Sequence, residues 1–217
     1  LKEIRSEYQA HIGRMLTLAG ADDATGKAAR IMALETRIAK VHWAAERTRD
    51  AIANYNPKTR AAVATFAPGL HWQAVFDVMD VGKWDLFNVN TPSAVKDVAA
   101  LVASQPLDDW KTYLAYHHIH NHAPYLPKAI DDENFAFFGK TLAGREQQRE
   151  RWQRGVDLVN NGLGEAIGQV YVKKHFPPEA KAKIDAPVEN MRTAYKANIE
   201  TLAWMGPETR AKALTKL

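Results

Sequence analysis

The sequence contains no cysteine among its 217 residues. Disulfide bonds, zinc sites built on thiolates and cysteine nucleophiles are therefore excluded together. No apolar run approaches the roughly 20 residues that a membrane-spanning helix requires, so we expect no membrane segment in this chain. No signal peptide is visible either. Because the chain begins with Leu1 and not with Met, we expect a processed or shortened chain, for which a missing signal peptide carries little weight.

A strong excess of charge of one sign is also missing. The 29 Lys and Arg residues are nearly balanced by 25 Asp and Glu residues, which leaves a net charge of +4, and the two signs are mixed along the chain. A basic stripe with interleaved aromatic residues, which is typical of nucleic-acid-binding surfaces, does not occur. We therefore expect no nucleic-acid partner.

What the sequence does contain is typical of a helical globular protein. Its composition is 46% apolar and 25% charged, with six tryptophans, and its length fits one hydrophobic core better than two. Stretches with apolar residues at spacings of three and four are separated by proline and glycine breaks, a pattern that predicts α-helices. We therefore predict an all-α fold: a single domain, residues 1–217, of about eight or nine helices.

The stretch from Trp152 to Trp204 organises this prediction. It contains two long amphipathic segments on either side of the break His175–Pro178. Their apolar stripes are Trp152, Val156, Val159, Leu163, Ile167 and Val170 in the first, and Ile184, Val188, Met191, Tyr195, Ile199 and Leu202 in the second. We expect two long antiparallel C-terminal helices that bury these stripes against each other. The interior Pro187 predicts a kink or a new first turn in the second helix.

Two further predictions concern the first half of the chain. A helix is expected to start near Thr25, capped by Asp22, Asp23 or Thr25, and to run to about Ala53. Trp84–Val89 is the only stretch that resembles a strand, and no convincing partner strand is present in the sequence. The other segments all read as helices.

The segment His117–His122 carries the clearest candidate for metal chemistry. On a helix, His118 and His122 share one face and could hold a metal ion at two points. A zinc site needs a third ligand, and neither His-Glu-x-x-His nor Glu-x-x-His occurs in the sequence. The alternative is a polar helix face on which one or two histidines bind neighbouring side chains, and we favour it.

Three other patterns resemble binding or catalytic motifs. Gly162–Gly168 is similar to a dinucleotide-binding loop, but no strand precedes it, so we expect Gly164 and Gly168 to let another helix approach closely. Asp131, Asp132 and Glu133 could form a carboxylate cluster, although charge at the start of a helix is the favoured role. The only serines are Ser6, Ser93 and Ser104, and none lies in a Gly-x-Ser-x-Gly elbow. No residue of the chain is therefore assigned a catalytic, cofactor-binding or metal-binding role.

Several short segments resemble the neprilysin-like zinc metallopeptidase family, and they follow the order of that family along nearly the whole chain. They are Ala33–Ala39, His42-Trp43, Arg47, Arg49-Asp50, Tyr55-Asn56, Ala123–Leu126, Glu133–Phe135, Phe138–Leu142, Leu163–Gly168, Tyr171-Val172, His175–Pro177, Trp204-Met205 and Thr209–Ala213. Each segment alone is weakly specific, and together they indicate the family.

The resemblance implies a substrate-gating helical lobe without catalytic residues, from the N-terminal part of a zinc endopeptidase that cleaves short peptides. In that family the zinc-binding His-Glu-x-x-His and the substrate-holding strand lie in a C-terminal catalytic lobe, so this chain alone is expected to bind no cofactor. The implied partners are that lobe and, in the whole protein, short peptides. The implied location is extracytoplasmic, either periplasmic or secreted. Arg47, Arg49 and Asp50 would form a structural ion-pair cluster. The alternative function is a helical interaction or scaffold module without peptidase activity.

Overall fold

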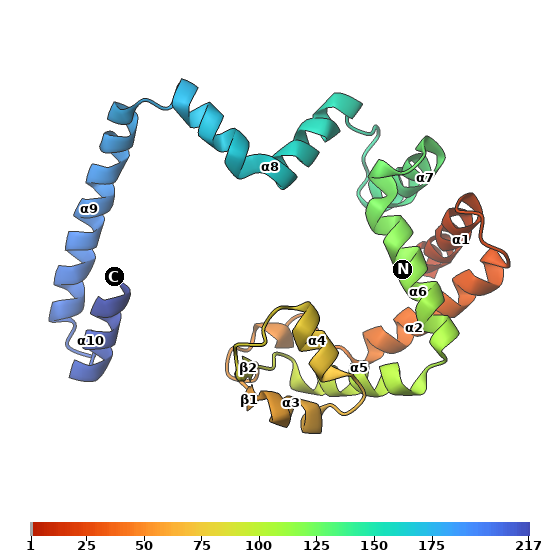
Figure 1. The fold of residues 1–217 in the computed structure, drawn as a ribbon, viewed down its shortest axis with the longest axis horizontal. Helices are drawn as coiled ribbons and strands as arrows, with labels where there is room; N and C mark the ends of the chain where they lie inside the picture. The colour runs from red at the N-terminus through yellow and green to blue at the C-terminus, as the bar shows by residue number, and fades with distance from the viewer. Residues whose placement is uncertain (1) are drawn as a thin grey trace. The chain divides into compact units, whose positions relative to one another are not determined.

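The computed structural model describes residues 2–217, which divide into two compact units, the first ending at Gln148 and the second running from Arg149 to Leu217. Ten α-helices account for most of these residues, together with short 3-10 helices, one π-helix and one two-stranded sheet (Figure 1). The prediction of an all-α fold is confirmed, with one or two helices more than expected. None of the described helices is long and apolar enough to cross a membrane.

The first unit begins with a helical hairpin of α1 (Lys2–Leu18) and α2 (Ala24–Val41). Gly20 has a φ of 78°, a left-handed conformation in which a glycine reverses the chain without strain. The side chain of Asp23 then accepts a hydrogen bond from the backbone N–H of Gly26 at 3.2 Å and caps α2. The expected cap is therefore confirmed.

Two further segments pack on this hairpin and complete the core of the first unit (Figure 1). They are α6 (Leu107–His122) with the 3-10 turn Ala123–Tyr125, and α7 (Lys128–Asn134), which continues directly as the π-helix Phe135–Leu142. The buried residues of this core are Ile12, Met15, Leu16, Ala28, Ile31, Tyr116, Ala123 and Ile130. Five of these eight residues, from Ile12 to Ile31, belong to the hairpin.

A smaller cluster lies beyond α2, where the elements β1 (Pro57–Thr59), α3 (Arg60–Phe66), α4 (Trp72–Val78), β2 (Leu86–Asn88) and α5 (Pro92–Ser104) follow one another. Its buried residues are Val63, Phe76 and Val89, with the Phe76 and Phe87 rings stacked at 4.7 Å between centroids. Helix α5 also contacts α2, so this cluster is joined to the main core.

The expectation that the strand near Trp84–Val89 has no partner is wrong. Strand β2 pairs antiparallel with β1, in the register Pro57 to Asn88 and Thr59 to Leu86. The partner was missed because β1 is only three residues long and begins with a proline, which lacks an N–H donor. Proline is tolerated here because each strand of a two-stranded sheet is an edge strand.

The second helix also ends earlier than expected, at Val41 and not near Ala53. The chain then passes through turns and the 3-10 helix Arg47–Arg49. In this described segment the expected ion-pair cluster is not formed. The Arg47 guanidinium lies 3.8 Å from the centroid of the Trp43 ring, and the Asp50 carboxylate accepts hydrogen bonds from the backbone N–H groups of Ile52 and Ala53. Arg47 and Asp50 therefore interact with an aromatic ring and with backbone N–H groups, and not with each other.

The second unit consists of the predicted long helices, α8 (Arg151–His175) and α9 (Pro178–Thr201), followed by α10 (Pro207–Lys216). Helix α9 continues through Pro187 without a new start, so the expected restart does not occur. The break lies in α8, where Leu163 has the non-helical angles φ −128° and ψ 17°. It is flanked by Gly162 and Gly164, which lower helix propensity on both sides.

The apolar stripes of α8 and α9 are exposed, contrary to the expectation that they bury each other. Neither helix has a buried residue in the described structure. Trp152 is 69% exposed, Leu163 63% and Tyr195 60%, whereas Ile12 and Met15 in the first unit are fully buried. Amphipathic spacing correctly predicted the helices, but it does not identify the surface that a stripe contacts.

Candidate functional site

The histidines of α6 bind neighbouring protein groups and do not form a metal site. The rings of His118 and His122 lie 4.3 Å apart between centroids, and the Nδ1–H of His122 donates to the backbone oxygen of His118 at 2.8 Å. The Nδ1–H of His120 donates to Oδ1 of Asn134 at 2.8 Å. Among the described residues, no group of three or more His, Cys, Asp or Glu side chains could hold a metal ion. These residues therefore do not fit a zinc site.

The three acidic residues of α7 point to three different partners and do not form one carboxylate cluster. Asp131 accepts a hydrogen bond from the side-chain amide of Gln148 at 3.0 Å, Asp132 pairs with Lys128, and Glu133 reaches across to α1. Asp131 lies in the first helical turn, which agrees with the favoured helix-start role.

The glycines of Gly162–Gly168 lie within α8 and not in a phosphate-binding loop. A Cβ atom added to Gly162, Gly164 or Gly168 would meet nothing within 4 Å. The expected close approach of another helix to Gly164 and Gly168 is therefore absent from the described structure. Open glycines leave this side of α8 available to a partner, and by themselves they do not identify one.

The serines take up structural positions. The Oγ of Ser93 accepts a hydrogen bond from Nε1 of Trp43 at 2.6 Å, and the hydroxyl of Ser104 donates to the backbone oxygen of Ala100 at 2.8 Å. Ser6 lines an open groove on α1. None of the three contacts a histidine in the described structure, so the arrangement of a serine nucleophile is not present.

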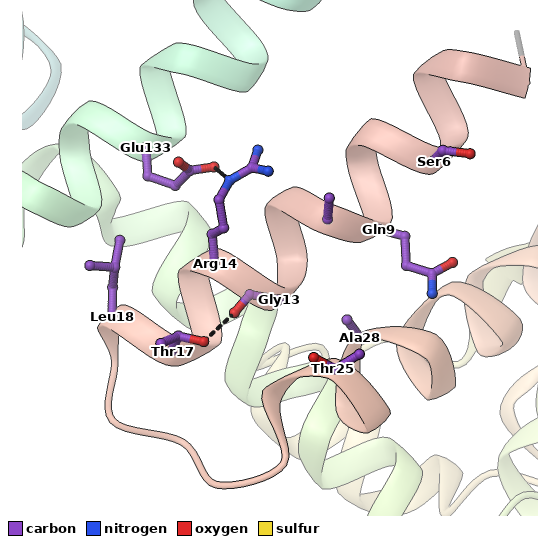
Figure 2. A pocket seen from close by; sticks show the side chains of 10 residues that line it. Ser6, Gln9, Gly13, Arg14, Thr17, Leu18, Thr25, Ala28 and Glu133 are labelled. Carbon is purple, nitrogen blue, oxygen red and sulfur yellow. Dashed lines mark hydrogen bonds and ion pairs between the residues drawn. The ribbon is translucent and has the colours of Figure 1, made fainter.

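The polar cluster that the fold does assemble joins α1 to α7, and it was not predicted from the sequence. Nδ1–H of His11 donates to Oε1 of Glu133 at 2.9 Å. Nε of Arg14 donates to the same oxygen at 2.8 Å, as Figure 2 shows. A second arm of the Arg14 guanidinium, Nη2, donates to Glu7 at 2.7 Å. One carboxylate of α7 therefore binds two cationic or polar side chains of α1.

An open groove of about 810 Å³ runs beside this cluster, between α1 and α2 (Figure 2). Its other walls are small or uncharged residues, namely Ser6, Gln9, Ala10, Gly13, Thr17, Leu18, Thr25 and Ala28. The two charged groups in the lining, Arg14 and Glu133, already neutralise each other. The groove therefore offers shape and the polar side chains of Ser6, Gln9 and Thr25, and in the described structure none of its hydroxyl groups is hydrogen-bonded to a base, as an activated nucleophile would be.

A second polar pair links α2 to α6 and α1. Oε1 of Glu35 accepts hydrogen bonds from the hydroxyl of Tyr8 at 3.0 Å and from Nε2 of His117 at 2.9 Å. Burial raises the pKa of the Tyr8 and Tyr116 hydroxyls well above the ordinary value, so both rings stay neutral. The hydrogen bonds of Glu35 connect three helices, α1, α2 and α6, and fix their relative positions.

These partners were hard to find from the sequence because they are far apart in it. His11 and Glu133 are separated by 122 residues, and Glu35 and His117 by 82. The one available indication was the position of His11 three residues after Tyr8, on the apolar side of the first helix.

Comparisons with known proteins agree on one family. The profile described as "Peptidase family M13", in its N-terminal region, matches residues 1–217. The chain is 26% identical to Neprilysin-3 of Drosophila melanogaster, over 99% of this chain and 29% of that protein, and 23% identical to Endothelin-converting enzyme 1 of Rattus norvegicus, over 96% and 28%. The structure is similar to the zinc metalloprotease ZMP1 of Mycobacterium tuberculosis in its open state, with a TM-score of 0.81 and 40% identity over 99% of this chain and 34% of that one.

The share of each protein that is covered is as informative as the identity. The chain spans less than a third of the length of the curated relatives that it matches, and it does so from end to end without a large gap. The helical architecture, the profile match over every residue and the order of the resembling segments all indicate the same assignment. The chain belongs to the neprilysin-like zinc metallopeptidases, peptidase family M13, and corresponds to their N-terminal region.

Proposed function

We propose that this chain is a helical lobe without catalytic residues of its own, which restricts the access of peptides to the zinc site of a zinc endopeptidase. The observation that carries the proposal is the match of all 217 residues to the N-terminal region of a zinc peptidase family. It is supported by the chemistry of the side chains, because the described residues assemble no metal site and their polar clusters are used between helices.

The exposed apolar stripes of α8 and α9 support a contact between this face and a large partner. An apolar face this extensive is unusual on a protein that works alone in water. The most exposed stripe residues are Trp152, Leu163, Val170, Ile184, Met191 and Tyr195. Because the relatives are more than three times as long as the matched region, we propose that the C-terminal catalytic lobe of the same protein covers part of this face.

In this proposal the zinc ion and the short peptide substrates belong to the whole protein, and the lobe contributes shape. When bound in the catalytic lobe, zinc would supply Lewis-acid activation of water for peptide hydrolysis. The residues of this chain would exclude bulky substrates and bulk water from that chamber. The hydrogen bonds of Glu35 and the buried core around Tyr116 suit such a wall, because a wall that selects by size has to keep its shape.

The direct test is an activity assay on the full chain, with short fluorogenic peptides and added zinc. We expect no hydrolysis above the buffer blank, and the same result with and without a chelator. A matched control is a known M13 peptidase in the same buffer, whose activity the chelator should remove. Peptide hydrolysis that co-purifies with the chain and disappears with chelator would contradict the proposal.

The second candidate is a helical interaction module without any peptidase partner, which the same exposed stripes would also suit. The two candidates differ in the gene around this segment. The gating lobe requires a His-Glu-x-x-His motif in the reading frame beyond residue 217, and the interaction module does not. Sequencing that reading frame therefore decides between them, whatever the outcome of the activity assay.

A further inference from the structure

One buried imidazole in the first unit is not accounted for by the proposed function. His11 has no exposed surface and lies at the junction of α1, α6, α7 and the π-helix. Its ring stacks on Phe137 at 4.9 Å between centroids and meets the edges of Phe138 at 5.4 Å and Tyr116 at 6.4 Å. A side chain that can take up a proton near neutral pH is therefore enclosed by aromatic rings.

The hydrogen bonds of His11 show which form of the ring the structure accommodates. Since an ionised carboxylate only accepts, Nδ1 must carry the proton that is donated to Glu133. The other nitrogen, Nε2, is buried and has no hydrogen-bond partner among the described residues. A second proton would place a buried N–H group there without an acceptor among the described residues, which is a strongly unfavourable arrangement.

The charged groups around His11 do not offset that cost. Glu133 would attract an imidazolium, but the same Oε1 already binds Arg14, whose positive charge opposes a second cation. On α6, His120 adds repulsion when it is charged, and the hydroxyls of Tyr8 and Tyr116 remain neutral. From α2, Glu35 faces the cluster only through its hydrogen bonds to Tyr8 and His117, and Glu7 is engaged by Arg14.

We propose that His11 is an acid-sensitive latch: uptake of a proton by its buried ring in mildly acidic surroundings loosens the junction of α1, α6 and α7 and destabilises the first unit. Burial lowers the pKa of His11 below its ordinary value of 6.5, and this effect outweighs the attraction of Glu133. Because the unfolded chain binds the proton more readily than the folded chain, the stabilisation is complete above about pH 6.5 and is lost as the pH falls below that value.

The test is urea unfolding of the full chain at pH 7.5 and pH 5.0, compared with His11→Gln and His11→Phe. Neither variant can titrate at this position. Between the two pH values, the unfolding equilibrium constant of the wild type should rise by up to about 30-fold more than that of either variant, the limit for one group with an unfolded pKa of 6.5. His118→Gln removes an exposed imidazole and serves as the matched control, which should keep the pH dependence of the wild type.

A direct measurement covers the case in which the His11 variants fail to fold. In the wild type, the imidazole Hε1 resonance of His11 in the folded chain should show no titration at or above pH 6.5, because burial lowers the pKa of this ring. If the His11 resonance titrates in the folded chain at or above pH 6.5, the latch does not exist. The same conclusion follows if the His11 variants keep the full pH dependence of the wild type.

Discussion

At Gly69 the loop before α4 lies very close to the backbone of α5. A Cβ atom built on it would lie 1.8 Å from the carbonyl oxygen and 2.2 Å from the carbonyl carbon of Ala99 in α5. Backbone atoms cannot move aside as a flexible side chain can, so the small cluster around Val63 and Phe76 depends on the absence of a side chain here.

We predict that Gly69→Ala destabilises the chain by about 1–3 kcal/mol or more, because α5 and the loop before α4 must separate to admit the methyl group. Urea unfolding monitored by tryptophan fluorescence measures the difference. Gly82→Ala is the matched control, since a Cβ there meets nothing within 4 Å, and it should be neutral or slightly stabilising. Equal stability of the two variants would contradict the close contact.

Single residues were predicted well where their neighbours in sequence decide the outcome. Asp23 acts as one of the caps that the sequence indicates, and His118 and His122 do share a helix face. The role of Glu133 could not be read, because its partners His11 and Arg14 lie more than a hundred residues earlier in the chain. Local spacing carries no information about such pairs.

At the scale of elements, Arg60 holds the small cluster together from the start of α3. Its Nη2 donates to the backbone oxygens of Gly82 at 2.7 Å and Trp84 at 2.6 Å, and its guanidinium lies 5.4 Å from the centre of the Phe76 ring. A positive charge at a helix N-terminus is unfavourable for the helix itself. The bonds to the loop before β2 therefore have to compensate for that position.

Replacing Arg60 by Met should lower the free energy of unfolding by about 1.5–3 kcal/mol, the usual range for hydrogen bonds of charged donors. Arg60→Lys keeps the charge without the planar fork and should fall between the wild type and Arg60→Met. Lys96→Met, at an exposed position of α5, is the control for loss of a cation and should change stability little. Urea unfolding provides the comparison, and an Arg60→Met variant as stable as Lys96→Met would show that the loop bonds contribute nothing.

Helices were easier to predict than their boundaries and partners. Periodicity placed the long helices α8 and α9 correctly, because a 3.6-residue repeat is a local property. Strand β1 was not predicted, because a strand of three residues is too short to show a period. Helix α9 continues through Pro187, although a proline inside a helix usually destabilises it. The π-helix at Phe135–Leu142 was read as ordinary helix, since the two differ by the hydrogen bonds of the backbone and not by the side-chain pattern.

At the scale of the whole molecule, the two units differ in what their apolar residues contact. The first unit has a core of buried side chains, and the second leaves its stripes exposed. The apolar spacing is equally clear in both units. It does not reveal whether the surface that an apolar stripe contacts belongs to the same chain. From the family assignment we propose that the partner of the second unit's stripes lies outside this chain, and an extracytoplasmic location stays a prediction.

The pairing of β1 with β2 has a consequence for the order in which the first unit opens and closes. The Asn88 side chain bonds to the backbone of Asn54 and Asn56, across 34 and 32 residues. Closing a loop of that length costs conformational entropy before any contact is gained, and only three residues are buried in the cluster that rewards it. We therefore expect the amide proton of Val89, bonded to Asn56, to exchange with solvent well before those of Ile12 and Met15. Equal protection of the three amides in native-state hydrogen exchange would show that the first unit opens as one cooperative body; unequal protection would make the region around the sheet the last part of the unit to form and the first to come apart.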